Sequence, residues 1–148
     1  MNRDEPSGFT LIEILVVVLI IGLLTTVIAT NLIGRAERAK AQLAETHLKA
    51  LSNQIELYRL DNGLYPDESQ GLEALVRKPS SDRDLRNYPP GGYLKPESLI
   101  DPWGTPYQYQ APGQHNTHSF DLYSFGPDGA EGGQGDNADI VNWDTGGA

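Results

Sequence analysis

The sequence contains no cysteine, so no disulfide bond can stabilise its fold. Basic residues are also scarce: 11 Lys and Arg stand against 20 Asp and Glu, which gives a net charge of −9. A surface this acidic would repel the phosphates of DNA or RNA, so we expect no nucleic-acid partner. For a chain of 148 residues, metal binding and oligomerisation remain as routes to additional stability.

Charge is nearly absent from residues 9–33, a dense apolar run whose single charged side chain is Glu13. A helix over this run would be roughly 37 Å long, enough to cross a hydrocarbon core of about 30 Å. The run contains no proline. A lone segment in a membrane becomes helical because it must satisfy its own backbone hydrogen bonds. The run therefore predicts a helical stem that is buried in a membrane or in an assembly.

The apolar pattern becomes one-sided after Gly34. Apolar residues recur at steps of three to five up to Tyr58, with charged residues mostly on the other face, as in an amphipathic helix. No proline or glycine interrupts residues 35–60, so we predict one long helix over residues 9–60. The pair Asn62-Gly63 then ends it.

The elements predicted beyond the long helix are short. Residues 69–76 are expected to form a helix that starts at Ser69, and residues 79–106 read as loop because prolines and glycines recur there. Residues 107–110 and 119–124 are strand candidates on either side of Pro112-Gly113, which predicts a hairpin.

The segment Gly8-Phe9-Thr10-Leu11-Ile12-Glu13, followed by the apolar run, is similar to the type IV prepilin signature. The resemblance implies that residues 1–8 are a leader, which a prepilin peptidase removes by cutting between Gly8 and Phe9. It also implies methylation of the new Phe9 amino group. Glu13 would then pair with the Phe9 amine of a neighbouring subunit during assembly.

Further segments resemble the major pseudopilins of type II secretion systems, the general secretion pathway protein G family. They are LYRLDNGLYP at 57–66, QGLEALV at 70–76, GYL at 92–94, DPWGTPY at 101–107, YSFGPDG at 123–129 and DIVNW at 139–143. Two features depart from the family pattern: Asp4 and Glu5 make the leader acidic, and Thr30 stands where many members have proline. The basic residues that follow the run, taken alone, would favour a cytoplasmic C-terminus, the reverse of the family orientation.

The resemblance implies an α+β, type IV pilin-like fold, in which a long N-terminal helix packs on a small antiparallel β-sheet with a Ca²⁺-binding loop. It divides the chain into a leader (1–8), a transmembrane or filament-core helix (9–33) and a periplasmic domain (34–148). The implied role is structural rather than enzymatic. The subunit would polymerise from the inner membrane into a periplasmic pseudopilus, with minor pseudopilins and an inner-membrane assembly platform as partners, and help drive folded proteins through a secretin.

Four acids lie close together near the C-terminus without an intervening Lys or Arg: Asp128, Glu131, Asp136 and Asp139. Clustered carboxylates on a glycine-rich backbone suit a hard cation that takes six to eight oxygens, although composition alone equally fits an acidic flexible tail. The family resemblance favours Ca²⁺. The implied ligands are the side chains of Asp128, Asp136 and Asp139 and the backbone carbonyls of Phe125 and Ala130, with Asn137 as a possible substitute for Asp136.

Two other functions compete with the pseudopilin interpretation. A surface type IV pilus subunit acting in adhesion or motility would share the signature, but the missing cysteines and the acidic loop count against it. A small binding protein exported by the Sec pathway would be cleaved after Ala29, so its mature chain would begin at Thr30. His115 and His118 have metal-like spacing, but with no third ligand nearby we expect a solvated hairpin loop. Trp103 and Trp143 are expected in the core or as a lid over it.

Overall fold

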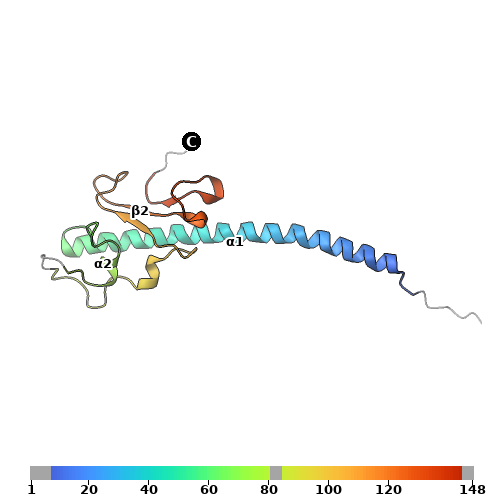
Figure 1. The fold of residues 1–148 in the computed structure, drawn as a ribbon. Helices are drawn as coiled ribbons and strands as arrows, with labels where there is room; N and C mark the ends of the chain where they lie inside the picture. The colour runs from blue at the N-terminus through green and yellow to red at the C-terminus, as the bar shows by residue number, and fades with distance from the viewer. Residues whose placement is uncertain (1–7, 81–84, 145–148) are drawn as a thin grey trace, which may run out of the picture. The chain divides into compact units, whose positions relative to one another are not determined.

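The structure, a computed structural model, describes residues 8–80 and 85–144, except for the side chains of residues 26–33. Two compact units divide the chain, Met1–Ala36 and Glu37–Ala148. The helices are α1 (Leu11–Asn62) and α2 (Glu73–Val76), with 3₁₀ turns η1 (Pro96–Leu99), η2 (Gly126–Asp128) and η3 (Gly135–Asn137). The strands are β1 (Gln108–Gln110), β2 (Asp121–Ser124) and β3 (Ile140–Val141) (Figure 1).

The start of α1 is fixed by Thr10 and Glu13. The Glu13 backbone N–H donates to Thr10 Oγ1 at 3.2 Å, and the Thr10 N–H donates to Glu13 Oε2 at 3.4 Å. This reciprocal arrangement is a capping box, which satisfies backbone donors that a helix start leaves unpaired. The helix consequently begins at Leu11, two residues later than predicted.

The first unit exposes the apolar side chains of the predicted stem. Phe9 is 81% exposed and Leu11 is 82% exposed, and large apolar side chains up to Leu24 are exposed as well. In the part of the chain that the structure describes, no helix is both long enough and apolar enough to cross a membrane. The side chains at the end of the predicted 9–33 segment lie outside the described residues.

Within the second unit, the amphipathic part of α1 forms one side of the hydrophobic core. Its buried side chains are spaced at three or four residues, so they lie on one face, and they pack against α2 and the sheet: Ala44, Leu48, Leu51, Ile55 and Tyr58. After Asn62, Gly63 takes a left-handed φ of 83° and its N–H donates to Arg59 O at 2.7 Å. The predicted end of the long helix at Asn62-Gly63 is therefore confirmed.

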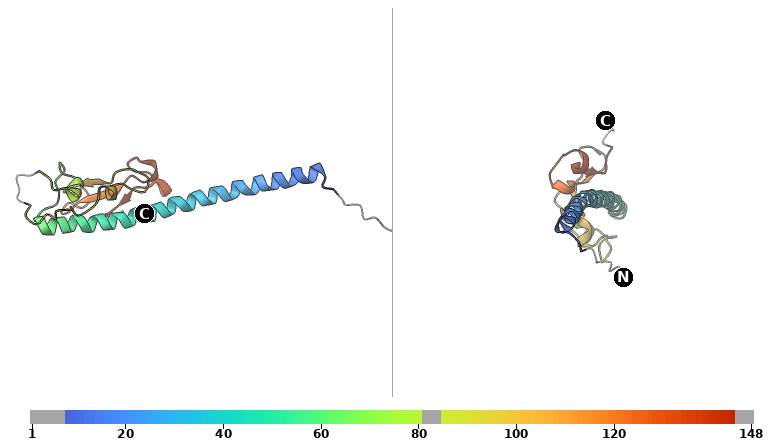
Figure 2. Two further views of the ribbon diagram at one scale, coloured as in Figure 1. Left: turned by 90° about the horizontal axis from the view of Figure 1, so that it is seen from below. Right: turned by 90° about the vertical axis from the view of Figure 1, so that its right-hand side faces the viewer.

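The sheet is antiparallel in the order β1-β2-β3. Tyr109 pairs with Leu122, which confirms the predicted hairpin, and Ser124 pairs with Ile140 on the other side of β2. Figure 1 and the left view of Figure 2 show the sheet beside the C-terminal part of α1. Leu122 and Phe120 bury their side chains in the same core as the helix. The α+β prediction of a helix packed on a small antiparallel sheet is thus confirmed.

The predicted helix over residues 69–76 is wrong in its first half. Asp67 holds a turn there, because its Oδ1 accepts from Ser69 Oγ at 2.6 Å and from the Gln70 N–H at 3.0 Å. Gly71 then adopts a left-handed φ of 55°. Helix α2 therefore begins only at Glu73.

Candidate functional site

The acidic segment is the connection between β2 and β3, residues 125–139, here called the acidic loop. Its two 3₁₀ turns, η2 and η3, pack against each other. The Gly132 N–H donates to Asp139 Oδ2 at 2.9 Å, and the Asp139 N–H donates to Gly132 O at 3.2 Å. The loop is therefore closed on itself at Gly132 and Asp139, by one contact to the Asp139 carboxylate and one between backbone groups.

Glycine is required at particular points of this closure. Gly126 and Gly133 have left-handed φ values of 70° and 83°. A β-carbon at Gly133 would collide with the carbonyl oxygen of Asn137, and one at Gly126 would lie 3.2 Å from Ala138 O. The glycine-rich composition thus belongs to a defined turn structure rather than to a tail without structure.

The predicted cation ligands are only partly arranged for a metal. Asp128 and Asp136 are exposed, and Asp128 Oδ1 accepts from the Ala130 N–H at 3.2 Å. Asp139 is half-buried, and its Oδ1 is buried without a hydrogen-bond partner. The described residues contain no cluster of three His, Cys, Asp or Glu able to hold a metal ion. Asp139 Oδ1 therefore fits a cation ligand, whereas the three carboxylates are not gathered into one shell.

The first end of the acidic loop is tied to the segment 101–105. Asp101 is 5% exposed; its Oδ1 accepts from the N–H groups of Trp103 at 3.0 Å and Thr105 at 2.8 Å, and its Oδ2 accepts from Ser124 Oγ at 2.5 Å. Ser124 Oγ in turn accepts from the Gly126 N–H at 3.0 Å. This chain of contacts fixes the point at which the loop leaves β2.

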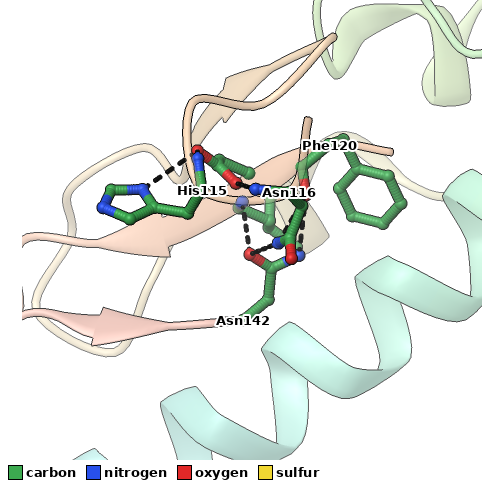
Figure 3. A network of polar contacts seen from close by, with 6 residues as sticks. His115, Asn116, Phe120 and Asn142 are labelled. Carbon is green, nitrogen blue, oxygen red and sulfur yellow. Dashed lines mark hydrogen bonds and ion pairs between the residues drawn. The ribbon is translucent and has the colours of Figure 1, made fainter. Parts of the chain in front are cut away.

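The second end is held by Asn142 (Figure 3). Its side-chain Oδ1 accepts from the Leu122 N–H at 2.9 Å, and its Nδ2 donates to Phe120 O at 3.2 Å. Asn116 Nδ2 also donates to Phe120 O, at 3.1 Å. The Asn142 side chain thus continues the pairing of β3 with β2 beyond the end of the strand.

The hairpin loop near His115 is held by specific side-chain contacts, unlike a simple solvated loop. His115 lies 3.1 Å from Asp121 Oδ2 through Nδ1, and its ring stacks on Trp143 at 4.1 Å between centroids. Asp121 is 2% exposed and accepts the backbone N–H groups of His115 and Asn116. Burial raises the pKa of Asp121, but these donors outweigh it and hold the pKa below 3.8. His118 is exposed, as expected for a loop residue.

Both tryptophans are half-buried at the edge of a groove of about 900 Å³ beside α1. The Trp103 Nε1–H donates to Glu37 Oε2 at 2.7 Å. Asp136 and Asp139 line the same groove. The tryptophans therefore border the acidic loop instead of filling the core.

The predicted processing site, Gly8-Phe9, lies before α1. Gly8 and Phe9 are exposed, and a β-carbon at Gly8 would meet nothing within 4 Å. The fold therefore gives no steric reason for glycine at this position. The leader residues 1–7 lie outside the described residues. Glu13 is exposed on the first turn of the helix, next to its capping partner Thr10.

Two family models match the chain in adjacent regions. The model described as type II secretion system (T2SS), protein G, matches residues 31–143, and the prokaryotic N-terminal methylation motif matches residues 6–29. The first covers the second unit up to residue 143, and the second covers the signature and most of the apolar run.

Curated relatives match over nearly their whole length. The type II secretion system core protein G of Pseudomonas aeruginosa is 49% identical over 98% of this chain and 100% of its own length. The protein of the same description from Vibrio cholerae is 49% identical over 94% of this chain and 92% of its own. A crystal structure of the major pseudopilin from the type 2 secretion system of enterohaemorrhagic Escherichia coli is 42% identical, with a TM-score of 0.62 over 76% of this chain and 94% of that one.

Proposed function

The chain belongs to the type II secretion system protein G family, and we propose that it polymerises into the pseudopilus as its major structural subunit. The observation that carries this proposal is the protein G match across the folded domain together with a methylation motif on the helix in front of it. Assembly is the activity in this proposal, and no bond chemistry is assigned to the chain.

We propose further that the pseudopilus forms in the periplasm from subunits held in the inner membrane by residues 9–33. The exposed apolar side chains at Phe9, Leu11 and Leu19 support this, because such a surface is stable only when lipid or neighbouring stems cover it. Minor pseudopilins and an assembly platform would be its partners, and growth would help drive folded proteins through the secretin. Expressing the secretion genes with and without this chain tests the role: periplasmic filaments and secretion should both be lost without it.

Processing between Gly8 and Phe9 is the step that would release the stem. Both residues are exposed, and they lie outside the capped helix, so a peptidase can reach the scissile peptide bond. The intact mass of the membrane-extracted chain should show loss of residues 1–8 and gain of one methyl group. A mature chain that begins at Met1 or at Thr30 would contradict this proposal.

Glu13 would pair with the amino group of Phe9 in a neighbouring subunit. Its exposed carboxylate lies in an apolar stem, where an unpaired charge is costly once the stem is covered. Glu13→Ala should therefore leave processing intact while filament yield falls to background. Because Glu13 also caps its own helix, Thr10→Val serves as the matched control: it removes the cap but keeps the carboxylate, and should still assemble.

We propose that the acidic loop binds Ca²⁺ through Asp128, Asp136 and Asp139, with the carbonyls of Phe125 and Ala130. The unpaired Asp139 Oδ1 and the hydrogen bond of Asp139 Oδ2 to the Gly132 N–H, which closes the loop, support this. A bound Ca²⁺ would offset the mutual repulsion of the carboxylates. Binding to the folded form alone stabilises it by about 2.7 kcal/mol at a free concentration of about 100 times Kd.

The melting temperature of the detergent-solubilised chain tests the Ca²⁺ site. It should be clearly lower in EGTA than in millimolar Ca²⁺, and Asp139→Ala should abolish the difference. Glu131→Ala removes a carboxylate from the same loop and should retain the difference in melting temperature. Identical melting curves with and without Ca²⁺ would refute the site and leave the assembly role untouched.

A further inference from the structure

We propose that Asp101 and Ser124 are positioning residues for the cation site of the acidic loop, although neither contributes a ligand. The inference rests on the Ca²⁺ site proposed above. It concerns how the fold places Asp128, the first carboxylate of the set, at the point where the chain leaves β2.

Asp101 is a buried carboxylate with a complete set of donors. A buried charge is tolerated only when hydrogen bonds replace its lost hydration. Two backbone N–H groups of the turn 101–105 bind one of its oxygens, and Ser124 Oγ binds the other. Since the N–H groups are fixed by the backbone, the carboxylate is held in one orientation, and the hydroxyl of Ser124 must point towards it.

The orientation of the Ser124 hydroxyl determines which hydrogen-bonding group it presents to the loop. A serine hydroxyl has one proton to donate and lone pairs to accept with. Because Asp101 takes the proton, the lone pairs of Ser124 Oγ are left for the Gly126 N–H, which it accepts at 3.0 Å. The hydrogen bonds from Asp101 through Ser124 to Gly126 are here called the relay. Because Ser124 is fully buried, the relay is shielded from water.

Gly126 is the residue whose position governs Asp128. It begins η2, a 3₁₀ turn that ends at Asp128, and it has the left-handed φ of 70°. A β-carbon at Gly126 would lie only 3.2 Å from Ala138 O, and η2 packs against η3, so η2 is held between the relay on one side and η3 on the other. The direction in which Asp128 leaves the sheet is thus set by Asp101 through Ser124.

Loss of the relay should weaken Ca²⁺ binding without removing a ligand. Without Ser124 Oγ the Gly126 N–H loses its acceptor, so η2 gains alternative conformations, and binding must restore the order before Asp128 can contribute. We expect the Ca²⁺ affinity of Ser124→Ala to fall about tenfold. Asp101→Asn should also weaken binding, because an amide NH₂ facing Ser124 Oγ cannot accept the serine proton, so the hydroxyl is no longer held in the orientation that serves Gly126.

The test measures Ca²⁺ affinity by calorimetry on the detergent-solubilised full chain, in parallel with its melting temperature in EGTA. Ser119→Ala is the matched control: it deletes a serine hydroxyl that donates to Tyr65 in the same domain but does not contact the loop. A purely structural role would lower the melting temperature in EGTA and leave affinity within about twofold of the parent chain. Weaker affinity in Ser124→Ala and Asp101→Asn, but not in Ser119→Ala, is the result expected.

Hydrogen exchange of the Gly126 amide gives a second measurement on the unmodified chain, which does not depend on a variant folding. Ca²⁺ should slow this exchange at least tenfold, since binding and the relay order the same turn. Unchanged exchange at Gly126 on Ca²⁺ binding, or unchanged affinity in both folded variants, would overturn the inference. Absence of Ca²⁺ binding by the parent chain would instead refute the site itself.

Discussion

Replacing Asn142 with alanine should destabilise the second unit by about 2–3 kcal/mol. The side chain accepts from the Leu122 N–H at 2.9 Å and donates to Phe120 O at 3.2 Å. Leu122 is 0% exposed, so its N–H would be left buried and unpaired, at a cost of about 1–3 kcal/mol. Phe120 O still accepts from the side-chain amide of Asn116, so losing its hydrogen bond to Asn142 adds less to the destabilisation.

Urea denaturation in mild non-ionic detergent, followed by tryptophan fluorescence, measures this change close to its origin, because Trp143 is the next residue. For an m value of about 1.5–2 kcal/mol per molar urea, the midpoint should fall by about 1–2 M. Asn53→Ala, which removes an exposed asparagine from α1, should change stability by less than about 0.5 kcal/mol. A midpoint for Asn142→Ala equal to that of Asn53→Ala would refute the view that this side chain closes the sheet.

Three further predictions concern pH, the acidic loop and the hydrophobic core. Asp121→Asn should flatten the acid side of the stability profile. Hydrogen bonds hold the pKa of Asp121 below 3.8, so the stabilisation that its carboxylate provides is present above that pH and is lost as pH falls through the lowered pKa. Urea midpoints measured from about pH 7 to about pH 2 will show the difference. Gly133→Ala should lower the melting temperature and weaken Ca²⁺ binding because its β-carbon meets Asn137 O, whereas Gly91→Ala, with a negative φ and open space, should do neither. Leu51→Ala should destabilise the domain by about 2–5 kcal/mol in chemical denaturation, since Leu51 is only 2% exposed in the centre of the core.

The elements that sequence predicts well are those whose causes are local. The long helix follows from periodicity, and its end follows from Asn62-Gly63. Its start at Leu11 also had a readable signal, since threonine followed three residues later by glutamate is a capping box. The hairpin of β1 and β2 likewise follows from two strand candidates on either side of Pro112-Gly113.

The elements that sequence missed depend on partners far along the chain. Strand β3 is only Ile140–Val141, too short for a periodic pattern, and it exists because Tyr123 and Ser124 pair with it. The relay from Asp101 to Gly126 spans segments with no shared motif. The clustering of acids in the acidic loop was visible in the sequence, but the distances between their carboxylates were not. Those distances depend on the path of the backbone, which is set by glycines with left-handed φ. The described residues contain nine of them, and several lie in this loop.

Both ends of the acidic loop are fixed next to β2, one through Ser124 and the other through Asn142. Its span is therefore set by the sheet, whatever the number of residues between the two points. A flexible insert between such fixed ends adds little closure entropy, since doubling the length of a flexible segment costs only about 0.6 kcal/mol. A short epitope or fluorophore-binding peptide inserted after Glu131, which is exposed, should thus be accepted by the fold. A label attached at this site would lie on the surface of the domain and would not disturb its core.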